Sequence, residues 1–256
     1  MRRRLLLNCL PGLLLFFWAI VASATVSIPV LAYHRFADTR ADSMTVRNEV
    51  FAGQMKLLRE QGYTVIPLRL AVDALQGKAV KLPVKPLVIT VDDGHRSVYS
   101  NLRPVILREK IPVTLLIYPS AISNASYGMT WQQLAELKET GLFDIQSHTY
   151  WHPNFKIEKR RLTPQAYQDF VKNQLEKSRR TLQKRLNADA DILAWPFGIY
   201  DEELMKAAQA AGYVAAFSID GRHARSGDAL LALPRHLMVD AMGVEGFAKM
   251  LKEGRQ

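Results

Sequence analysis

Short apolar runs alternate with helical stretches along most of this chain, and this alternation restricts its fold more than any other feature. Regular β-α alternation gives a parallel sheet with helices outside it, either open or closed into a barrel. Seven runs are predicted as strands: Ile28–Tyr33, Thr64–Pro67, Leu87–Asp92, Val113–Tyr118, Phe143–His148, Asp191–Trp195 and Tyr213–Ser218. The residues alone therefore predict one α/β domain with parallel strands, and periodicity leaves barrel closure open.

Apolar spacing predicts helices between these runs. Phe51, Met55 and Leu58 repeat on one helical face. Thr163 precedes a proline, which is typical of an N-cap followed by the first helical residue. The inward stripe of that long helix is predicted to comprise Tyr167, Phe170, Val171, Gln174, Leu175, Ser178 and Leu182. Two further helices are predicted over residues 201–211 and 244–251.

Polar residues follow several predicted strands. Asp92 and Asp93 end one strand, His148 ends another, and His152 comes four residues later. The carboxyl ends of parallel strands meet at one edge, so these side chains are expected close together. Two imidazoles and one carboxylate can hold a divalent metal, and the second carboxylate remains as a base. An Asp-Asp-Gly turn or an H-x-x-x-H spacing means little alone, but together they predict a metal site.

These residues resemble those of a known family, the polysaccharide deacetylases of the NodB-homology group (carbohydrate esterase family 4). TVDDG at residues 90–94 is similar to the family motif T-F-D-D-G, and residues 148–153 are similar to H-[ST]-x-x-H-P. A third motif, R-x-P-[FY], is half matched by AWPFG at 194–198. The resemblance runs from about residue 28 to 251 and implies a single distorted (β/α)7 barrel. PVLAYHRF at the start and the late LPR look most like the branch that deacetylates poly-N-acetylglucosamine.

The resemblance implies that Asp93, His148 and His152 bind the metal and that Asp92 is the general base. Zinc is the default metal for this ligand set, and cobalt or nickel would also fit it. Adjacent residues of a regular strand point to opposite faces. The backbone must therefore turn between the two aspartates, and Gly94 makes such a turn inexpensive.

An amide also needs a proton delivered to its leaving nitrogen. His34 is the preferred general acid, because this branch resembles a permuted form with the acid motif at the start of the chain. His236 is the alternative acid, and a packed core histidine is the alternative reading of His34.

The arginine expected at the start of the third motif is absent, since position 194 is Ala194. In the family, that arginine orients the catalytic carboxylate and keeps it ionised. Arg235 is favoured as its replacement because it follows an apolar run, and Arg35 is the alternative.

Aromatic residues near the predicted site suit a sugar ligand, because pyranose C–H groups pack on flat apolar rings. The candidates for substrate binding are Trp151, Trp195, Phe197 and Tyr200. Aromatic residues also fill protein cores, so this reading stays open, above all for Phe197. Backbone N–H groups of residues 198–200 are expected to form an oxyanion hole.

The first 24 residues are predicted to be a secretory signal peptide. Three arginines precede an apolar stretch over residues 5–21, which ends in an A-x-A cleavage site. The alternative is an uncleaved membrane anchor through residues 5–21. Cleavage predicts a periplasmic or secreted protein whose deacetylase domain covers residues 25–256.

The chain is basic, with a formal net charge of +10, and loss of the three leader arginines would lower this to +7. Such an excess favours association with anionic envelope surfaces or polymers. Much of it lies between residues 156 and 185, where a solvated helix face is the simpler explanation. No nucleic-acid-binding motif is present, and the predicted export argues against a nucleic-acid partner.

Together these features predict metal-dependent hydrolysis of N-acetyl groups from an exported polysaccharide, with poly-β-1,6-N-acetylglucosamine as the leading substrate. The first alternative is the same reaction on peptidoglycan or chitin oligomers. The second is a catalytically inactive carbohydrate-binding protein, which Ala194 favours and the intact aspartate–histidine set opposes. The sequence does not predict the oligomeric state.

Overall fold

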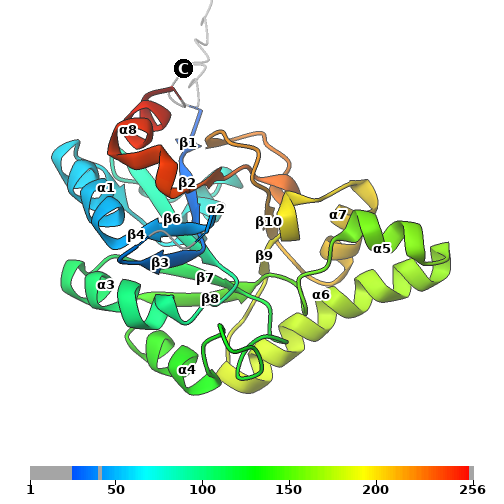
Figure 1. Cartoon of the computed structure of the whole chain (residues 1–256). Coiled ribbons are helices and arrows are strands. Elements are labelled where there is room, and N and C mark those ends of the chain that lie inside the picture. Colours follow the sequence, from blue (N-terminus) through cyan, green and yellow to red (C-terminus); the bar gives the residue numbers. More distant parts are fainter. Residues whose placement is uncertain (1–24, 40–41, 254–256) are drawn as a thin grey trace, which may run out of the picture.

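The computed structural model describes residues 25–39 and 42–253, which form a curved parallel sheet surrounded by helices (Figure 1). The signal peptide and the alternative anchor lie outside the described residues and stay predictions. Within the described part, no helix is long and apolar enough to cross a membrane.

Seven parallel strands form the main path of the sheet. They are β2 (Val30–Tyr33), β6 (Pro86–Asp92), β7 (Val113–Ile117), β8 (Phe143–Ser147), β9 (Ile192–Ala194), β10 (Ala215–Phe217) and β12 (His236–Leu237). Their spatial order is β10-β9-β8-β7-β6-β2-β12, so the last strand of the chain lies beside the first of the seven. Their side chains are almost all buried, as expected for strands covered on both faces.

The segment before β12 joins the two edges of this sheet. Leu233 forms a parallel bridge with Phe217 of β10, and its carbonyl accepts from the Ser218 N–H at 2.7 Å. Four residues later, β12 ends beside β2, where Leu237 pairs with Ala32. Residues 233–237 therefore touch both β10 and β2 and complete a ring of seven strands. The expected distorted (β/α)7 barrel is confirmed.

One predicted strand does not belong to the ring. The run Thr64–Pro67 contains only the two-residue strand β5 (Thr64–Val65), which pairs with the start of β6 off the main path. The seventh strand is β12, which the apolar pattern missed. It is two residues long and follows Arg235, a charged residue at a fully buried position. Hydrophobic periodicity cannot find so short a strand when a buried arginine directly precedes it.

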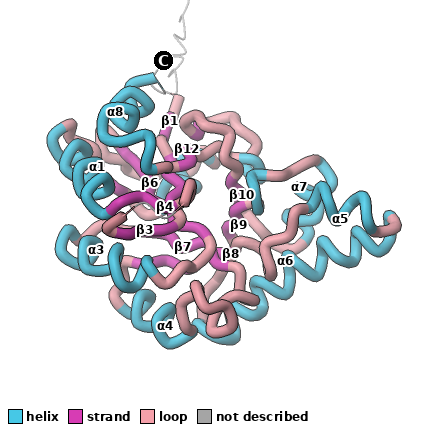
Figure 2. The backbone as a smooth tube through the Cα atoms, in the orientation of Figure 1, coloured by secondary structure: helices cyan, strands magenta, loops and turns pink. Residues whose placement is uncertain are grey.

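Eight α-helices surround the described part of the barrel (Figure 2): α1 (Asn48–Glu60), α2 (Leu68–Leu75), α3 (Arg103–Glu109), α4 (Trp131–Glu139), α5 (Phe155–Arg161), α6 (Pro164–Leu186), α7 (Glu202–Ala210) and α8 (Gly243–Glu253). The Thr163 hydroxyl caps α6 as predicted, accepting from the Ala166 N–H. Six of the seven predicted inward residues of α6 are buried, and Phe170 is half-buried.

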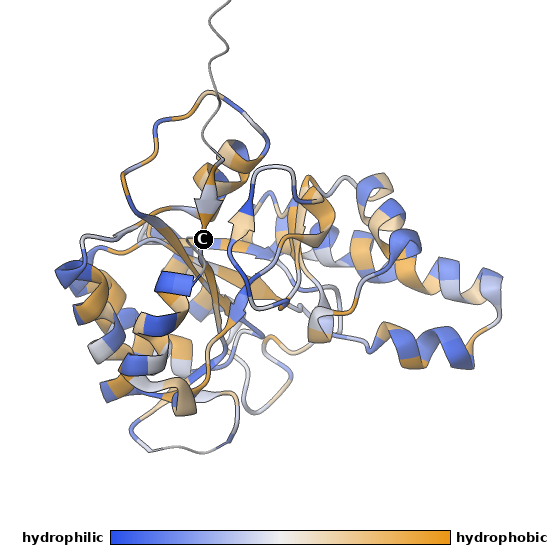
Figure 3. Ribbon diagram, turned by 90° about the horizontal axis from the view of Figure 1, so that it is seen from above, coloured by the Kyte–Doolittle hydropathy of each residue, from blue (hydrophilic) through white to orange (hydrophobic). Residues whose placement is uncertain are grey.

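The remaining strands are short and lie at the rim: β1 (Ser27–Ile28) pairs antiparallel with β11 (Ala224–Arg225), and β3 (Arg35–Ala37) pairs in parallel with β4 (Thr45–Arg47). Together α5 and α6 form an arm, residues 155–186, that projects from the barrel (Figure 1). Figure 3 shows long hydrophilic stretches on this arm. Beneath it, Tyr167, Val171 and Leu175 pack with Trp195 in an apolar cluster that attaches the arm to the barrel.

Candidate active site

A cavity of about 300 Å³ opens at the carboxyl ends of the barrel strands. The residues that follow β2, β6, β7, β8 and β9, and those around β12, contribute its walls. The side chains that matter for chemistry are His34, Asp92, Asp93, Tyr118, His148, His152, Phe197 and Arg235. The parallel topology thus gathers at one mouth residues as far apart in the chain as His34 and Arg235. We refer to this space as the catalytic cavity.

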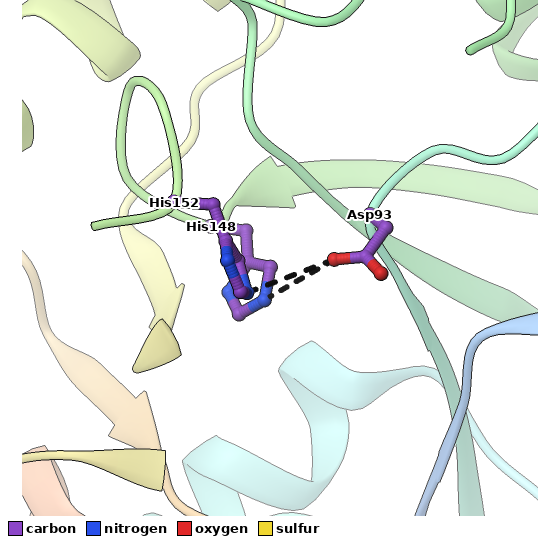
Figure 4. Close-up of side chains that lie close together, drawn as sticks. All are labelled: Asp93, His148 and His152. Atoms are coloured by element: carbon purple, nitrogen blue, oxygen red, sulfur yellow. Dashed lines mark ion pairs between the residues drawn. The ribbon is translucent and has the colours of Figure 1, made fainter. Parts of the chain in front are cut away.

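Asp93, His148 and His152 form a cluster that can hold a metal ion (Figure 4). Asp93 Oδ1 lies 3.7 Å from His148 Nε2 and 3.8 Å from His152 Nε2. One ligand atom from each residue lies within 4.8 Å of the other two. Asp93 Oδ1 is also buried and has no hydrogen-bond partner in the described part of the chain. An acceptor left unpaired between two imidazoles fits a bound cation.

The backbone turns sharply to bring these ligands together. Strand β6 ends at Asp92, and the next two residues, Asp93 and Gly94, have φ values of 73° and 75°. His152 also has a positive φ, 62°. The turn expected between the two aspartates is therefore present. It requires Asp93 to adopt a strained left-handed conformation. Such conformations in non-glycine residues persist where the surrounding structure holds them, and here they aim the ligands into the cavity.

Hydrogen bonding prepares His148 to act as a ligand. Its ring is buried, and Nδ1 lies 2.8 Å from the Ala194 carbonyl oxygen, so Nδ1–H is the donor. This bond directs the lone pair of Nε2 towards Asp93, the arrangement common among metal-binding histidines. Burial, and then the neighbouring His148, lower the pKa of His152 to about 4. The His152 imidazole is thus neutral at pH 7, as metal ligation requires.

Asp92 forms a buried bidentate ion pair with Arg235. The guanidinium donates from Nη1 to Oδ1 at 2.8 Å and from Nη2 to Oδ2 at 2.7 Å, and both side chains are at most 2% exposed. Its other donors reach the Ser218 carbonyl and the Thr90 hydroxyl. Burial alone would raise the pKa of Asp92, but the charge of Arg235 outweighs it and holds the pKa below its usual value. Asp92 is therefore an ionised, oriented carboxylate.

This pair bears on the missing arginine of the third motif. Ala194 ends β9 and contributes only its carbonyl, to His148. Arg235 approaches Asp92 from the segment before β12 instead. Arg35, the alternative, also lines the cavity but forms its ion pair with Asp42, at 2.5 Å.

The two candidate acids lie in different places. His34 follows β2, is half-buried and lines the catalytic cavity, and its buried Nδ1 has no hydrogen-bond partner among the described residues. Burial lowers its pKa despite the opposing charges of Asp92 and Asp93. His236 does not line the cavity and packs edge-to-face on His223, with ring centroids 5.2 Å apart. The structure therefore brings His34 to the site and does not bring His236.

Of the four aromatic residues predicted to bind sugar, two line the cavity and two do not. Phe197 lines the cavity, is 56% exposed and packs edge-on against His152, with centroids 4.6 Å apart. Trp195 borders the cavity but is 1% exposed, and its Nε1 donates to the Leu231 carbonyl. Trp151 packs against Phe170 of the arm, and Tyr200 donates to Asp220; neither lines the cavity.

The predicted oxyanion-hole donors are largely engaged elsewhere. The Gly198 N–H donates to the Trp195 carbonyl at 2.9 Å, and the Ile199 N–H donates to the Pro196 carbonyl at 3.0 Å. Both bonds belong to the 3₁₀ turn Pro196–Gly198 that follows β9. For these two groups the prediction is wrong, because a tight turn uses its own N–H groups.

Sequence reasoning missed Tyr118. It directly follows β7, lines the cavity, and its ring centroid lies 5.3 Å from that of His152. Its hydroxyl lies 2.6 Å from that of Tyr127. The signal was present, since Tyr118 ends a predicted strand at the same edge of the sheet as the two aspartates.

Comparison with known proteins identifies the family of this chain. The model of the polysaccharide deacetylase family matches residues 79–216, more than half of the chain. The chain therefore belongs to the polysaccharide deacetylases, which are hydrolases, as the motifs indicated. The resemblance drawn from the sequence is confirmed.

Relatives from Escherichia coli and Staphylococcus aureus bear the name poly-β-1,6-N-acetyl-D-glucosamine N-deacetylase. The Escherichia coli protein is 24% identical over 261 residues, which cover 86% of this chain and 38% of the relative. The Staphylococcus aureus protein is 24% identical over 201 residues, which cover 77% of this chain and 68% of the relative. The chain thus spans well under half the length of the E. coli relative.

Solved structures support the same fold. The deacetylase PplD of Streptococcus pyogenes, solved in complex with acetate, superposes with a TM-score of 0.78 at 23% identity. The match covers 89% of this chain and 99% of that one. At 23% identity this similarity establishes the fold. The substrate and the roles of the residues have to be argued from the geometry of the site.

Proposed function

We propose that this protein removes N-acetyl groups from exported poly-β-1,6-N-acetylglucosamine in a metal-dependent reaction that releases acetate and leaves free amines. The observation that carries the proposal is the juxtaposition of two unlike carboxylates at the end of β6. Asp93 has an unpaired oxygen facing two imidazoles, whereas Asp92 is held by Arg235. The names of the E. coli and S. aureus relatives support the choice of polymer.

Asp93, His148 and His152 would hold the metal, for which zinc is the first choice and cobalt or nickel the alternatives. When bound, such an ion polarises a carbonyl oxygen and lowers the pKa of water to roughly 7. The ligand set uses three protein groups, the number typical of catalytic zinc sites that keep a position open.

Asp92 is the proposed general base. It lies at the floor of the cavity, 3.9 Å from His148 Nε2, and Arg235 keeps it ionised. It can accept a proton from a water molecule that attacks the acetamide carbon. His34 is the proposed acid, because it lies on the wall of the same cavity and can deliver a proton to the departing nitrogen. Phe197 offers an exposed apolar face at the mouth for a sugar ring.

The reading as an inactive binding protein loses its main support. It rested on Ala194, but Arg235 now supplies the guanidinium that the motif lacks. A protein that only binds sugar has no need of a buried, ionised base beside a metal site.

Export belongs to the same proposal. Residues 1–24 would direct the chain across the inner membrane, and cleavage would release the domain of residues 25–256 into the periplasm or beyond. An uncleaved anchor through residues 5–21 would place the same domain at the membrane surface. The net positive charge supports contact with anionic envelope surfaces in either case.

Acetate release from defined oligomers tests the function. The zinc-loaded protein is expected to deacetylate β-1,6-linked N-acetylglucosamine oligomers faster than β-1,4-linked ones, and to lose activity with a chelator and regain it with zinc. Faster release from β-1,4 chitin or peptidoglycan oligomers would correct the substrate. No release from any of them would contradict the enzyme assignment.

A further inference from the structure

A second cavity, of about 540 Å³, lies next to the catalytic cavity. Strand β3 is the wall between them: Arg35 borders the catalytic cavity, whereas Phe36 and Ala37 border the second one. Adjacent residues of one strand thus border both spaces. The two spaces are therefore close enough for neighbouring units of one polymer chain.

Three aromatic rings, which we call the aromatic ledge, run from one cavity to the other. Tyr118 lines the catalytic cavity, and its hydroxyl meets that of Tyr127 at 2.6 Å. The Tyr127 ring stacks on His95 with a centroid distance of 6.2 Å and an interplanar angle of 7°. His95 in turn lines the second cavity. The ledge is thus continuous between the two spaces.

The backbone holds the ledge rigidly. The Arg96 N–H donates to the Tyr127 carbonyl at 2.8 Å, and His95 and Gly128 form an antiparallel bridge. A Cβ atom at Gly128 would lie 2.8 Å from the Ala121 carbonyl oxygen, so the loop is closely packed there. A pre-formed surface of this kind loses little entropy when a ligand binds.

The ledge presents groups that suit a sugar. Tyr127 is 40% exposed although one of its faces lies on His95. Only one proton is needed between the hydroxyls of Tyr118 and Tyr127, so the second remains free to donate to a ligand. Flat rings with a polar edge can take both the C–H face and the hydroxyls of a pyranose.

The second cavity adds polar side chains from an irregular helix. A π-helical turn, Val98–Leu102, places Tyr99, Ser100 and Asn101 in its lining. Such turns are rare and occur often at functional sites. Asp38 and Arg96 bring one charge of each sign, and Asn101 adds an amide. Mixed, mostly neutral hydrogen-bonding groups fit a hexosamine better than a strongly charged ligand.

We infer that the second cavity binds a neighbouring hexosamine unit of the same polysaccharide chain, and that the aromatic ledge carries the chain between the two cavities. This inference rests on the proposed function, because it takes its ligand from that reaction. The inference goes beyond that function because it assigns a second sugar-binding site and the path of the polymer between the two cavities. Longer oligomers should therefore bind better than a monomer, which fills only the catalytic cavity.

Binding and turnover of the monomer and the hexamer of N-acetylglucosamine test the subsite. Tyr127→Ala and Asn101→Ala should each weaken hexamer binding to the zinc-loaded protein by roughly threefold to tenfold, measured by calorimetry. Monomer binding should change by less than about twofold, which corresponds to under 0.5 kcal/mol. Tyr127→Phe, which keeps the ring and loses the hydroxyl, should lie between Tyr127→Ala and the wild type.

Asn173→Ala, at an exposed position of α6, is the matched control and should change neither ligand. An equal loss of binding for monomer and hexamer, no loss for either, or a wild-type protein that does not bind the hexamer would overturn the subsite. Acetate release by the wild type is measured separately and reports on the proposed function. If the protein binds the hexamer more tightly than the monomer but releases no acetate, the subsite is supported and the proposed reaction is contradicted.

Discussion

Two arginine–carboxylate pairs, one at the barrel mouth and one on the arm, look alike in distance and differ in almost every other respect. Arg235 lies 2.7 Å from Asp92, and Arg180 lies 2.9 Å from Glu176 of the same helix. The first pair is 0% and 2% exposed, whereas the second is 65% and 32% exposed. Water screens the pair on the arm, so its contribution to stability is small. At the mouth, loss of one partner would leave a buried charge without compensation.

The backbone shows the same contrast. Asp93, Thr149, His152 and Phe197, all at the mouth, have positive φ values although none is a glycine. On the arm, residues 155–186 are regular helix apart from a short turn, and the left-handed residue Asn187 follows only after α6 ends. Strain concentrated at the mouth keeps the ligands aimed at one point, whereas the arm has no such constraint. Substitutions should therefore act very differently in the two regions.

The largest effect is expected at the metal ligands. Asp93→Ala or His148→Ala should abolish bound zinc and acetate release together, because each removes one of three ligand groups. Elemental analysis and an acetate assay on the same sample measure both. Asp169→Ala, an exposed aspartate of the arm, should change neither. A His148→Ala protein that keeps its activity and its full metal content would contradict the expectation that the mouth is far more sensitive to substitution than the arm.

Asp92→Asn should lower turnover by roughly 10²–10⁴-fold while the protein keeps its zinc. The amide nearly preserves the volume of the side chain but cannot accept a proton from water. Steady-state kinetics with elemental analysis separates this loss from loss of metal. Activity within a few-fold of the wild type would show that the base lies elsewhere.

His34→Ala should damage amide cleavage by roughly 10²-fold or more and spare an activated acetate ester. The leaving group of such an ester departs without a proton, whereas an amine does not. His236 does not line the cavity, so His236→Ala is the matched control and should show no such selectivity. Equal losses on amide and ester in His34→Ala would remove this histidine from the acid role.

Arg235→Ala should lower the free energy of unfolding by about 3–5 kcal/mol in urea titrations at neutral pH. It should also alter the pH dependence. Arg235 lowers the pKa of Asp92, so the carboxylate stabilises the fold above its unfolded pKa and loses this contribution as the pH falls through its folded pKa. Without Arg235 that folded pKa rises, and the acidic limb of the pH–rate profile should move to higher pH.

Arg235→Lys retains the charge without the bidentate geometry and should fall between the wild type and Arg235→Ala in both measurements. An acidic limb that does not move in Arg235→Ala would mean that another group keeps Asp92 ionised.

The smallest effect is expected on the arm. Arg180→Ala should change the free energy of unfolding by no more than about 0.5 kcal/mol, because its ion pair is exposed and screened. Urea titrations at low and high salt measure it. A loss comparable to that of Arg235→Ala would contradict the argument that burial, rather than distance, decides the strength of such pairs.

Local pattern predicted a large part of this structure. Six of the seven barrel strands and the cap of α6 followed from apolar periodicity and cap chemistry, because both depend on neighbouring residues. The grouping of Asp92, Asp93 and His148 at one edge followed from parallel topology and was found there. Their catalytic roles stay predictions for the experiments above.

The sequence by itself determined the alternating fold, the family and the residues that can supply metal-binding and proton-transfer groups. Only the tertiary structure decided which distant residues complete the site. It placed Arg235 on Asp92 across 143 positions, brought in Tyr118 and left His236 outside the lining of the cavity. Hydrophobic periodicity indicates which face of a helix or strand is buried. It cannot locate a buried charge such as that of Arg235, because burial of a charge depends on an oppositely charged partner elsewhere in the chain. That pairing exists only once the ring of strands has closed.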